Sequence, residues 1–185
     1  MTKSVLKDLI VYLLNSAGET SKVKLAKLIL FADILHFNKM GASITGMYYV
    51  RLRNGPVIAF FDEVLEQNKG TLWSIVTKEI PIYSEGIMKL QYLYTPLVKK
   101  EPPKEIKQTI QQVIKKYGAK SGTKLSNESH SLPAWKYSEP NEPIFIAELA
   151  VRDEKEYFAL IDLLEDTEDN DSDLAKKIPS PVPPS

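Results

Sequence analysis

The chain has 185 residues, of which 43% are hydrophobic and 26% charged, and it contains no cysteine. This length suits one domain with its own core, and no apolar run approaches the ~18–20 residues that a membrane span requires. The absence of cysteine excludes disulfides, thiolate metal sites and cysteine nucleophiles, and it is typical of a protein in the reducing cytoplasm.

Charge is unevenly distributed, although 24 basic residues balance 24 acidic ones. Residues 165–185 contain six acidic residues and two lysines, so this segment has a net charge of −4 and residues 1–164 one of +4. A net charge of only +4 over residues 1–164 argues against nucleic acid as the partner, since nucleic-acid-binding domains concentrate many more basic side chains on one face. Residues 166–185 are also rich in proline, and we expect them to be a disordered tail outside a domain at residues 1–165.

Two helices are predicted at the start of the chain. Hydrophobic residues recur at helical spacing from about Ser4 to Ala17, and Gly18 ends this pattern. Because the chain begins in this amphipathic pattern rather than in a signal peptide, we expect no export and a cytoplasmic protein. The second helix is predicted from an N-cap at Ser21 to about Lys39, and its apolar residues cover nearly the whole circumference, as in a central, buried helix.

A period-two pattern follows and predicts a short, half-buried strand with an aromatic and basic outer face. The side chains expected to point inward are Tyr48, Val50 and Leu52, and those expected on the outer face are Tyr49, Arg51 and Arg53. Asn54-Gly55 is typical of a hairpin, but Pro56 follows it. Apolar residues from Val57 onward then recur at helical spacing, so we predict a turn and a third helix that ends near Gly70.

The rest of the domain is predicted to contain two strands and three helices. Alternating residues predict antiparallel strands from Leu72 to about Tyr83 and from Ile87 to Thr95, joined by a turn at Ser84-Glu85-Gly86. The predicted helices run from Ile106 to Tyr117, from about Leu125 to His130, and from Asp153 to about Glu165 with Asp153 and Glu156 as a capping box. The last of these is expected to turn Tyr157, Leu160, Ile161 and Leu164 inward. The fold class is therefore α+β, a mainly helical single domain with a small antiparallel sheet.

Few residues carry a catalytic pattern, because the sequence has no glycine-rich phosphate loop, nucleophile elbow or metalloprotease motif. Asp33 interrupts the apolar helix and lies one turn before His36, so the two could form an acid–base dyad. The interpretation we favour is a buried carboxylate that holds the helix against the strand, with Arg51 or Arg53 as its candidate partners. We expect a binding protein rather than an enzyme, with no cofactor and no metal.

Three further features have a structural and a functional interpretation. Ser126 and His130 are one helical turn apart, as a nucleophile and its base can be, but no third group orients His130. The Tyr49, Arg51 and Arg53 face suits an interface or a phosphate surface as well as it suits a solvated strand. Trp135 is interpreted as the anchor of its loop to the core, with an exposed interface residue as the alternative.

Several of these segments together resemble the Panacea domain, the SocA-like antitoxin-associated family. The resemblance depends on the following segments in order: Leu25-Ala26-Lys27-Leu28-Ile29-Leu30-Phe31-Ala32-Asp33, His36, Gly41 to Gly46, Tyr48 to Val50, Gly55-Pro56-Val57, Leu125-Ser126, His130 and Trp135. Two features depart from the family pattern, namely Ala134 between Pro133 and Trp135, and the acidic, proline-rich tail. The resemblance extends over about Ser4 to Leu164.

This resemblance implies a compact, mainly helical α+β domain that binds and neutralises a cognate toxin of a toxin–antitoxin system by direct contact. The candidate partner-binding residues are the polar side chains that the signature displays: Asp33, His36, Tyr49, Arg51, Arg53 and His130. One alternative is a nucleic-acid-binding or regulatory protein of a mobile element that uses Arg51 and Arg53 together with Lys22, Lys24 and Lys27. A hydrolase that uses Ser126 and His130, or Asp33 and His36, is the third hypothesis.

Overall fold

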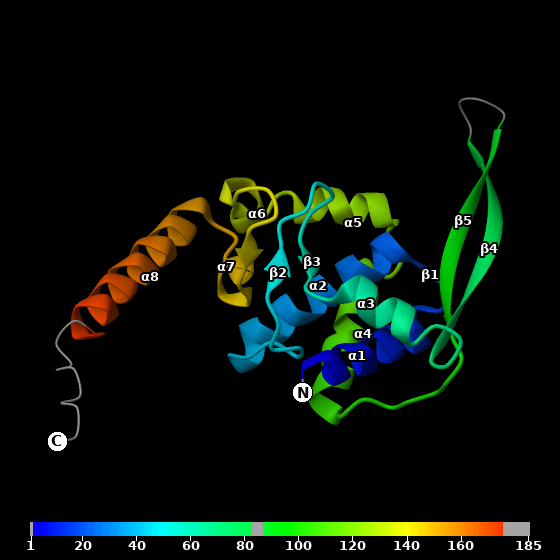
Figure 1. The fold of residues 1–185 in the computed structure, drawn as a ribbon. Helices are drawn as coiled ribbons and strands as arrows, with labels where there is room; N and C mark the ends of the chain where they lie inside the picture. The colour runs from blue at the N-terminus through cyan, green and yellow to red at the C-terminus, as the bar shows by residue number, and fades with distance from the viewer. Residues whose placement is uncertain (1, 83–86, 176–185) are drawn as a thin grey trace, which may run out of the picture.

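The fold is a mainly helical α+β domain in the computed structural model, which describes residues 2–82 and 87–175, and the predicted fold class is confirmed (Figure 1). The helices are α1 (Thr2–Ala17), α2 (Lys22–Met40), α3 (Phe61–Gln67), α4 (Lys104–Tyr117), α5 (Gly122–Ser129), α6 (Pro133–Tyr137), α7 (Ile146–Ala150) and α8 (Glu154–Ala175). The strands are β1 (Thr20–Ser21), β2 (Tyr49–Val50), β3 (Val57–Ile58), β4 (Trp73–Ile82), β5 (Ile87–Pro96) and β6 (Pro143–Ile144). No helix in the described ranges is both long and apolar enough to span a bilayer.

Helix α2 is the centre of the domain, as predicted. The Ser21 hydroxyl accepts a hydrogen bond from the Lys24 N–H at the start of the helix, and Gly41 ends it with φ of 74° and an N–H that donates to the Phe37 carbonyl. Residues 25–34 are all buried, because α1, α4, α5 and α7 contact α2 from different sides. The ten buried residues include two ionisable ones, Lys27 and Asp33, and both belong to the candidate site.

The strands form two separate three-stranded antiparallel sheets rather than one. In the first, with order β1-β5-β4, the β4–β5 pair is antiparallel, as predicted, with a register from Trp73↔Pro96 to Ile82↔Ile87, and it projects from the helical body as a long arm (Figure 1). The predicted turn at Ser84-Glu85-Gly86 lies outside the described residues. The second sheet, with order β3-β2-β6, brings residues near 50, 57 and 144 together beside α2.

The segment after β2 differs from the prediction because it forms a hairpin. Val57 and Ile58 pair with β2 instead of starting a helix, and α3 begins only at Phe61 and ends at Gln67. Pro56 is compatible with this hairpin because it lies in the turn before β3, where the sheet requires no N–H from it.

The predicted faces of the β2 strand are wrong. Tyr49 is fully buried, whereas Tyr48 and Leu52, which were expected to point inward, are each 39% exposed. The strand is only two residues long, so the alternation does not continue through Arg51 to Arg53. Tyr49 faces α2 because its hydroxyl reaches the Asp33 carboxylate there.

Helix α8 is longer than predicted and lies apart from the rest of the body (Figure 1). The Asp153 carboxylate accepts hydrogen bonds from the backbone of Lys155 and Glu156, which confirms Asp153 as the cap, but the helix continues to Ala175. Residues 166–175 are thus helical where disorder was predicted, because the segment contains neither proline nor glycine before Pro179. Residues 176–185 lie outside the described residues, and the division into a domain and a tail stays a prediction.

The first turns of α8 carry the contacts with the body. Tyr157 is buried, as predicted, whereas Leu164 is 42% exposed and does not point inward.

Candidate partner-binding site

Asp33 is a buried structural carboxylate that fixes the chain between α2 and β2. Its oxygens accept hydrogen bonds from the Ile44 N–H at 2.9 Å, the Thr45 N–H at 3.2 Å, the Thr45 hydroxyl at 2.5 Å and the Tyr49 hydroxyl at 2.8 Å. Burial raises the pKa of the Asp33 carboxyl, and these hydrogen bonds oppose that rise. The predicted role of holding the helix against the strand is confirmed, but the partners are Thr45 and Tyr49 rather than Arg51 or Arg53.

Asp33 and Tyr49 have no exposed surface with which to contact a partner. Burial, together with the adjacent Asp33 charge, also raises the pKa of the Tyr49 hydroxyl well above its ordinary value. His36 is not part of this network, because its Nδ1 lies 3.0 Å from the Thr109 hydroxyl on α4. The hypothesis of an Asp33–His36 dyad therefore has no support in the geometry.

The turn between β2 and β3 is held by three backbone carbonyls at alternate positions, each of which accepts a hydrogen bond from a different helix. Trp135 Nε1 in α6 donates to the Leu52 carbonyl at 2.8 Å. The Ser126 hydroxyl in α5 donates to the Asn54 carbonyl at 2.6 Å, and Lys27 Nζ in α2 donates to the Pro56 carbonyl at 2.7 Å. Segments that are far apart in sequence thus meet at this one turn.

Gly55 is required at the centre of this turn. Its φ is 91°, and a Cβ at this position would lie 2.1 Å from the Ser129 hydroxyl and 2.8 Å from Lys27 Nζ. Such distances are too short for any side chain, and the left-handed backbone also favours glycine. The turn therefore lies directly against α2 and α5.

Lys27 is a buried lysine, because the residue is only 1% exposed. Its one hydrogen bond is to the Pro56 carbonyl, and within the described ranges no carboxylate lies at ion-pair distance from its ammonium. Burial lowers the pKa of Lys27 to about 7. The sequence predicted a buried helix here but did not single out Lys27 as a buried charge, because lysine is rarely fully buried.

Trp135 anchors its loop, as predicted, and it also organises two of the candidate residues. The His130 ring stacks on the Trp135 indole with centroids 3.9 Å apart, and the Arg51 guanidinium lies 4.7 Å from the same ring. Burial and the positive charges of Lys27 and Arg51 lower the pKa of His130. Ala134 is fully buried in α6, so it is accommodated as part of a short helix that the sequence did not predict.

The arrangement does not favour hydrolysis by Ser126 and His130. The Ser126 hydroxyl donates a hydrogen bond to the Asn54 carbonyl, so it is directed at the backbone rather than at the buried Nε2 of His130. Nor do the described residues contain a group of three histidine or acidic side chains that could hold a metal ion.

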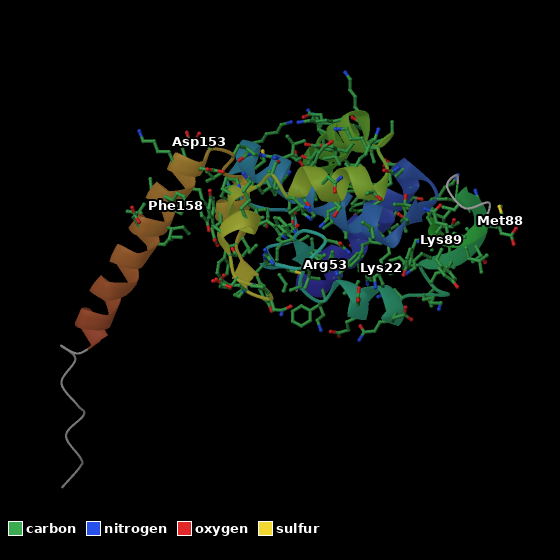
Figure 2. All side chains as sticks on the ribbon, turned by 90° about the horizontal axis from the view of Figure 1, so that it is seen from above. Lys22, Arg53, Met88, Lys89, Asp153 and Phe158 are labelled. Atoms are coloured by element: carbon green, nitrogen blue, oxygen red, sulfur yellow. The ribbon has the colours of Figure 1, made fainter. Side chains whose placement is uncertain are left out.

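A pocket of about 830 Å³ lies on the outer side of the turn, between the start of α2 and the start of α3. Arg53 and Lys22 both line it and lie close together on one face of the body (Figure 2). Lys22 forms an ion pair with Asp62 at 2.9 Å, whereas Arg53 is exposed and has no ion pair among the described residues. The pocket also includes Lys27 and several apolar side chains.

Two residues of this pocket have an unusual backbone. Phe60, with φ of 60°, and Asn141, with φ of 68°, are the two non-glycine residues with positive φ in the described ranges, and both line the pocket. Asparagine adopts this conformation with little cost, but for an aromatic residue it is strained. The helical spacing had indicated that Phe60 faces the core, whereas its side chain is 47% exposed.

Fold and site together define a small α+β domain in which three helices converge on a turn that forms one wall of an open pocket. A family model described as antitoxin SocA-like, Panacea domain, matches residues 25–136. The match covers more than half of the chain, and the chain belongs to this family. Comparisons with curated proteins and with solved structures found no match.

Proposed function

We propose that this protein is an antitoxin that binds and neutralises a cognate toxin by direct protein–protein contact. The observation that carries the proposal is the family match over residues 25–136, which includes α2 from Leu25 onward, the β2–β3 turn and Trp135. The exposed pocket beside that turn gives a partner a surface with apolar area and unpaired positive charge.

Binding rather than catalysis is supported by the partners of the polar residues. Asp33 and Ser126 are each committed to backbone or hydroxyl groups of the fold, and neither is hydrogen-bonded to a histidine. General acid–base or nucleophilic catalysis needs such a pair within hydrogen-bond reach. We therefore propose that the protein is not an enzyme.

Nucleic-acid binding is less favoured than it was from the sequence, because the three lysines proposed for it have other partners. Lys22 pairs with Asp62, Lys24 Nζ donates to the Gly118 carbonyl at 2.6 Å, and Lys27 is buried. Phosphate contacts require exposed basic side chains that can replace counterions.

Co-expression of this protein with the product of its neighbouring gene tests the proposal. We expect the neighbour alone to stop growth, growth to return when this protein is also expressed, and the two proteins to copurify. A neighbour without toxicity, or toxicity that persists despite soluble antitoxin, would refute the proposal. Gel-shift assays at low ionic strength provide the comparison with nucleic acid, for which binding that weakens steeply with salt would favour the alternative.

A further inference from the structure

The pocket beside the β2–β3 turn is lined by two basic side chains, Arg53 and Lys27, that no carboxylate of the described residues pairs with. Arg53 lies at its edge without an ion pair among the described residues, and the buried Lys27 has a backbone carbonyl as its hydrogen-bond acceptor. A buried ammonium without a counter-charge is costly to the fold. Its presence there is explained if a negative group from outside binds nearby.

The two acidic residues of the pocket are already paired. Asp62 pairs with Lys22 at 2.9 Å, and Glu63 pairs with Lys3 at 2.7 Å. The unpaired charge of the pocket is therefore positive, and it comes from Arg53 and Lys27. Asp62 and Glu63 also line the pocket, and their negative charges lie close to any bound ligand. A ligand with several negative charges would be repelled more strongly than a ligand with a single one.

The pocket also offers apolar surface that a simple anion would not use. Val23 and Phe60 line it and are 42% and 47% exposed, and Ala26 and Val57 contribute to its wall. The Phe60 ring is held at the mouth by a strained backbone, and strained residues of this kind concentrate at binding and active sites. The occupant should therefore combine one negative charge with apolar area.

We propose that this pocket binds a segment of the partner protein in which an aspartate or glutamate side chain lies next to an apolar or aromatic one. Arg53 pairs with the carboxylate through its planar guanidinium, and the protonated form of Lys27 adds positive potential from its buried position in the pocket wall. The apolar side chain packs against Val23 and Phe60. This inference deepens the proposed function and rests on it for the identity of the partner as a toxin.

The charge pattern favours a carboxylate over the phosphates of a nucleotide. The pocket provides Arg53 and one buried lysine, whereas a polyphosphate site is usually built from several backbone N–H groups at a helix N-terminus or a glycine-rich loop. No glycine is among the residues that line this pocket.

Selection from a displayed library of short random peptides against the purified full-length protein tests this inference without the toxin. We expect the enriched peptides to share an acidic residue beside an aliphatic or aromatic one. Their affinity should fall about tenfold or more in Arg53→Glu, since this variant reverses the charge that contacts the carboxylate. Lys89→Glu is the matched control, because Lys89 is exposed on the β4–β5 arm, away from Arg53 (Figure 2), and the change in net charge is the same.

Phe60→Gly is the second variant, since glycine adopts the φ of 60° without strain and the fold should be retained. We expect it to weaken the same peptides by about tenfold, because it removes the exposed aromatic ring. Enriched peptides without an acidic residue, or equal affinity for Arg53→Glu and Lys89→Glu, would overturn the inference. So would tight binding of ATP that Arg53→Glu abolishes, because the pocket would then be a phosphate site.

The two proposals fail in different ways. If the peptides behave as expected but the neighbouring gene is not toxic, the inference about the pocket is supported and the proposed antitoxin function is refuted. If the wild type and Arg53→Glu restore growth equally, the antitoxin function is supported, but the toxin does not bind at this pocket.

Discussion

Asp33 is a carboxylate inside an apolar helix, and its burial is possible because four donors surround it. Two are backbone N–H groups of residues 44 and 45, which belong to the segment that follows α2, and two are the hydroxyls of Thr45 and Tyr49. The Asp33 carboxylate therefore fixes the path of the chain after Gly41, because it binds the backbone of residues 44 and 45.

We predict that Asp33→Ala costs about 3–5 kcal/mol of unfolding free energy, because it leaves four buried donors without an acceptor. Asp33→Asn should cost less, about 1–2 kcal/mol, since the amide oxygen still accepts and both hydroxyls can rotate to accept from its NH₂. Urea denaturation of the three proteins measures the difference. Equal losses for Ala and Asn would show that the charge, rather than the hydrogen bonds, determines the stability.

Lys27 gives the stability of the protein a specific pH dependence. Burial lowers its pKa in the folded state to about 7, while the unfolded chain keeps the ordinary value near 10.5. Between these two values the unfolded state binds more protons, so the contribution of Lys27 to the free energy of unfolding rises with pH. Below pH 7 both states are protonated, and the full cost of the buried charge is present.

We predict that the wild type gains stability relative to Lys27→Met as the pH is raised from 7 to 9, by up to about 1.4 kcal/mol per pH unit. Methionine has a similar length and no titrating group, so the difference between the two proteins isolates Lys27. Urea denaturation of both proteins at several pH values from 6 to 9 provides the measurement. Parallel curves for the two proteins would mean that the Lys27 ammonium is hydrated in the folded state.

The β2–β3 turn is an element whose shape depends on three distant helices. Trp135, Ser126 and Lys27 each donate to one carbonyl of the turn, and Gly55 permits the close approach. Lys27 and Trp135 are more than a hundred positions apart in sequence, yet both hold this turn. Arg53, which lies between two of the held carbonyls, is presented to the pocket as a consequence.

We predict that Gly55→Ala destabilises the protein by roughly 2–4 kcal/mol, from backbone strain together with a clash against Ser129 and Lys27. Gly46→Ala is the matched control, because Gly46 has φ of 64° but no atom within 4 Å of the added Cβ. Gly46→Ala should lower the free energy of unfolding by only about 1 kcal/mol. Thermal unfolding of both variants tests this, and similar losses would show that the turn can move away from α5.

The elements that the sequence predicted best are those whose pattern is local. The antiparallel pairing of β4 with β5 follows from alternation, and the start of α2 follows from the N-cap at Ser21. The face of Tyr49 and the hairpin at Val57 were wrong, because both depend on contacts with residues remote in sequence. No local pattern could have indicated these contacts.

At the candidate site, the sequence predicted a turn after β2 but not the side chains that donate hydrogen bonds to it. Arg51 and His130 meet at Trp135, whereas Arg53 lines the pocket. Asp33 and Tyr49 are buried behind the turn, and His36 lies against α4. The positive φ of Phe60 arises where the hairpin meets α3, so the sequence had no means of indicating that its ring is exposed.

On the scale of the whole molecule, α8 is joined to the body by its first turns. Lys136 pairs with Glu154 at 2.8 Å, and the Tyr137 ring lies 6.0 Å from Tyr157 and 4.8 Å from Phe158. Tyr157 is buried, whereas Phe158 is 46% exposed. The domain core should therefore depend on the start of α8 much more than on its acidic continuation.

We predict that removal of residues 166–185 changes the melting temperature by less than ~2 °C, because the contacts described between α8 and α6 come from residues before the cut. Tyr157→Ala in the full chain should instead cost about 2–4 kcal/mol, since it removes a buried ring from the junction with α6. Calorimetry of the two variants beside the wild type makes the comparison. If the truncated chain melts as early as Tyr157→Ala, the acidic half of α8 is part of the folded domain, and the boundary predicted at residue 165 is wrong.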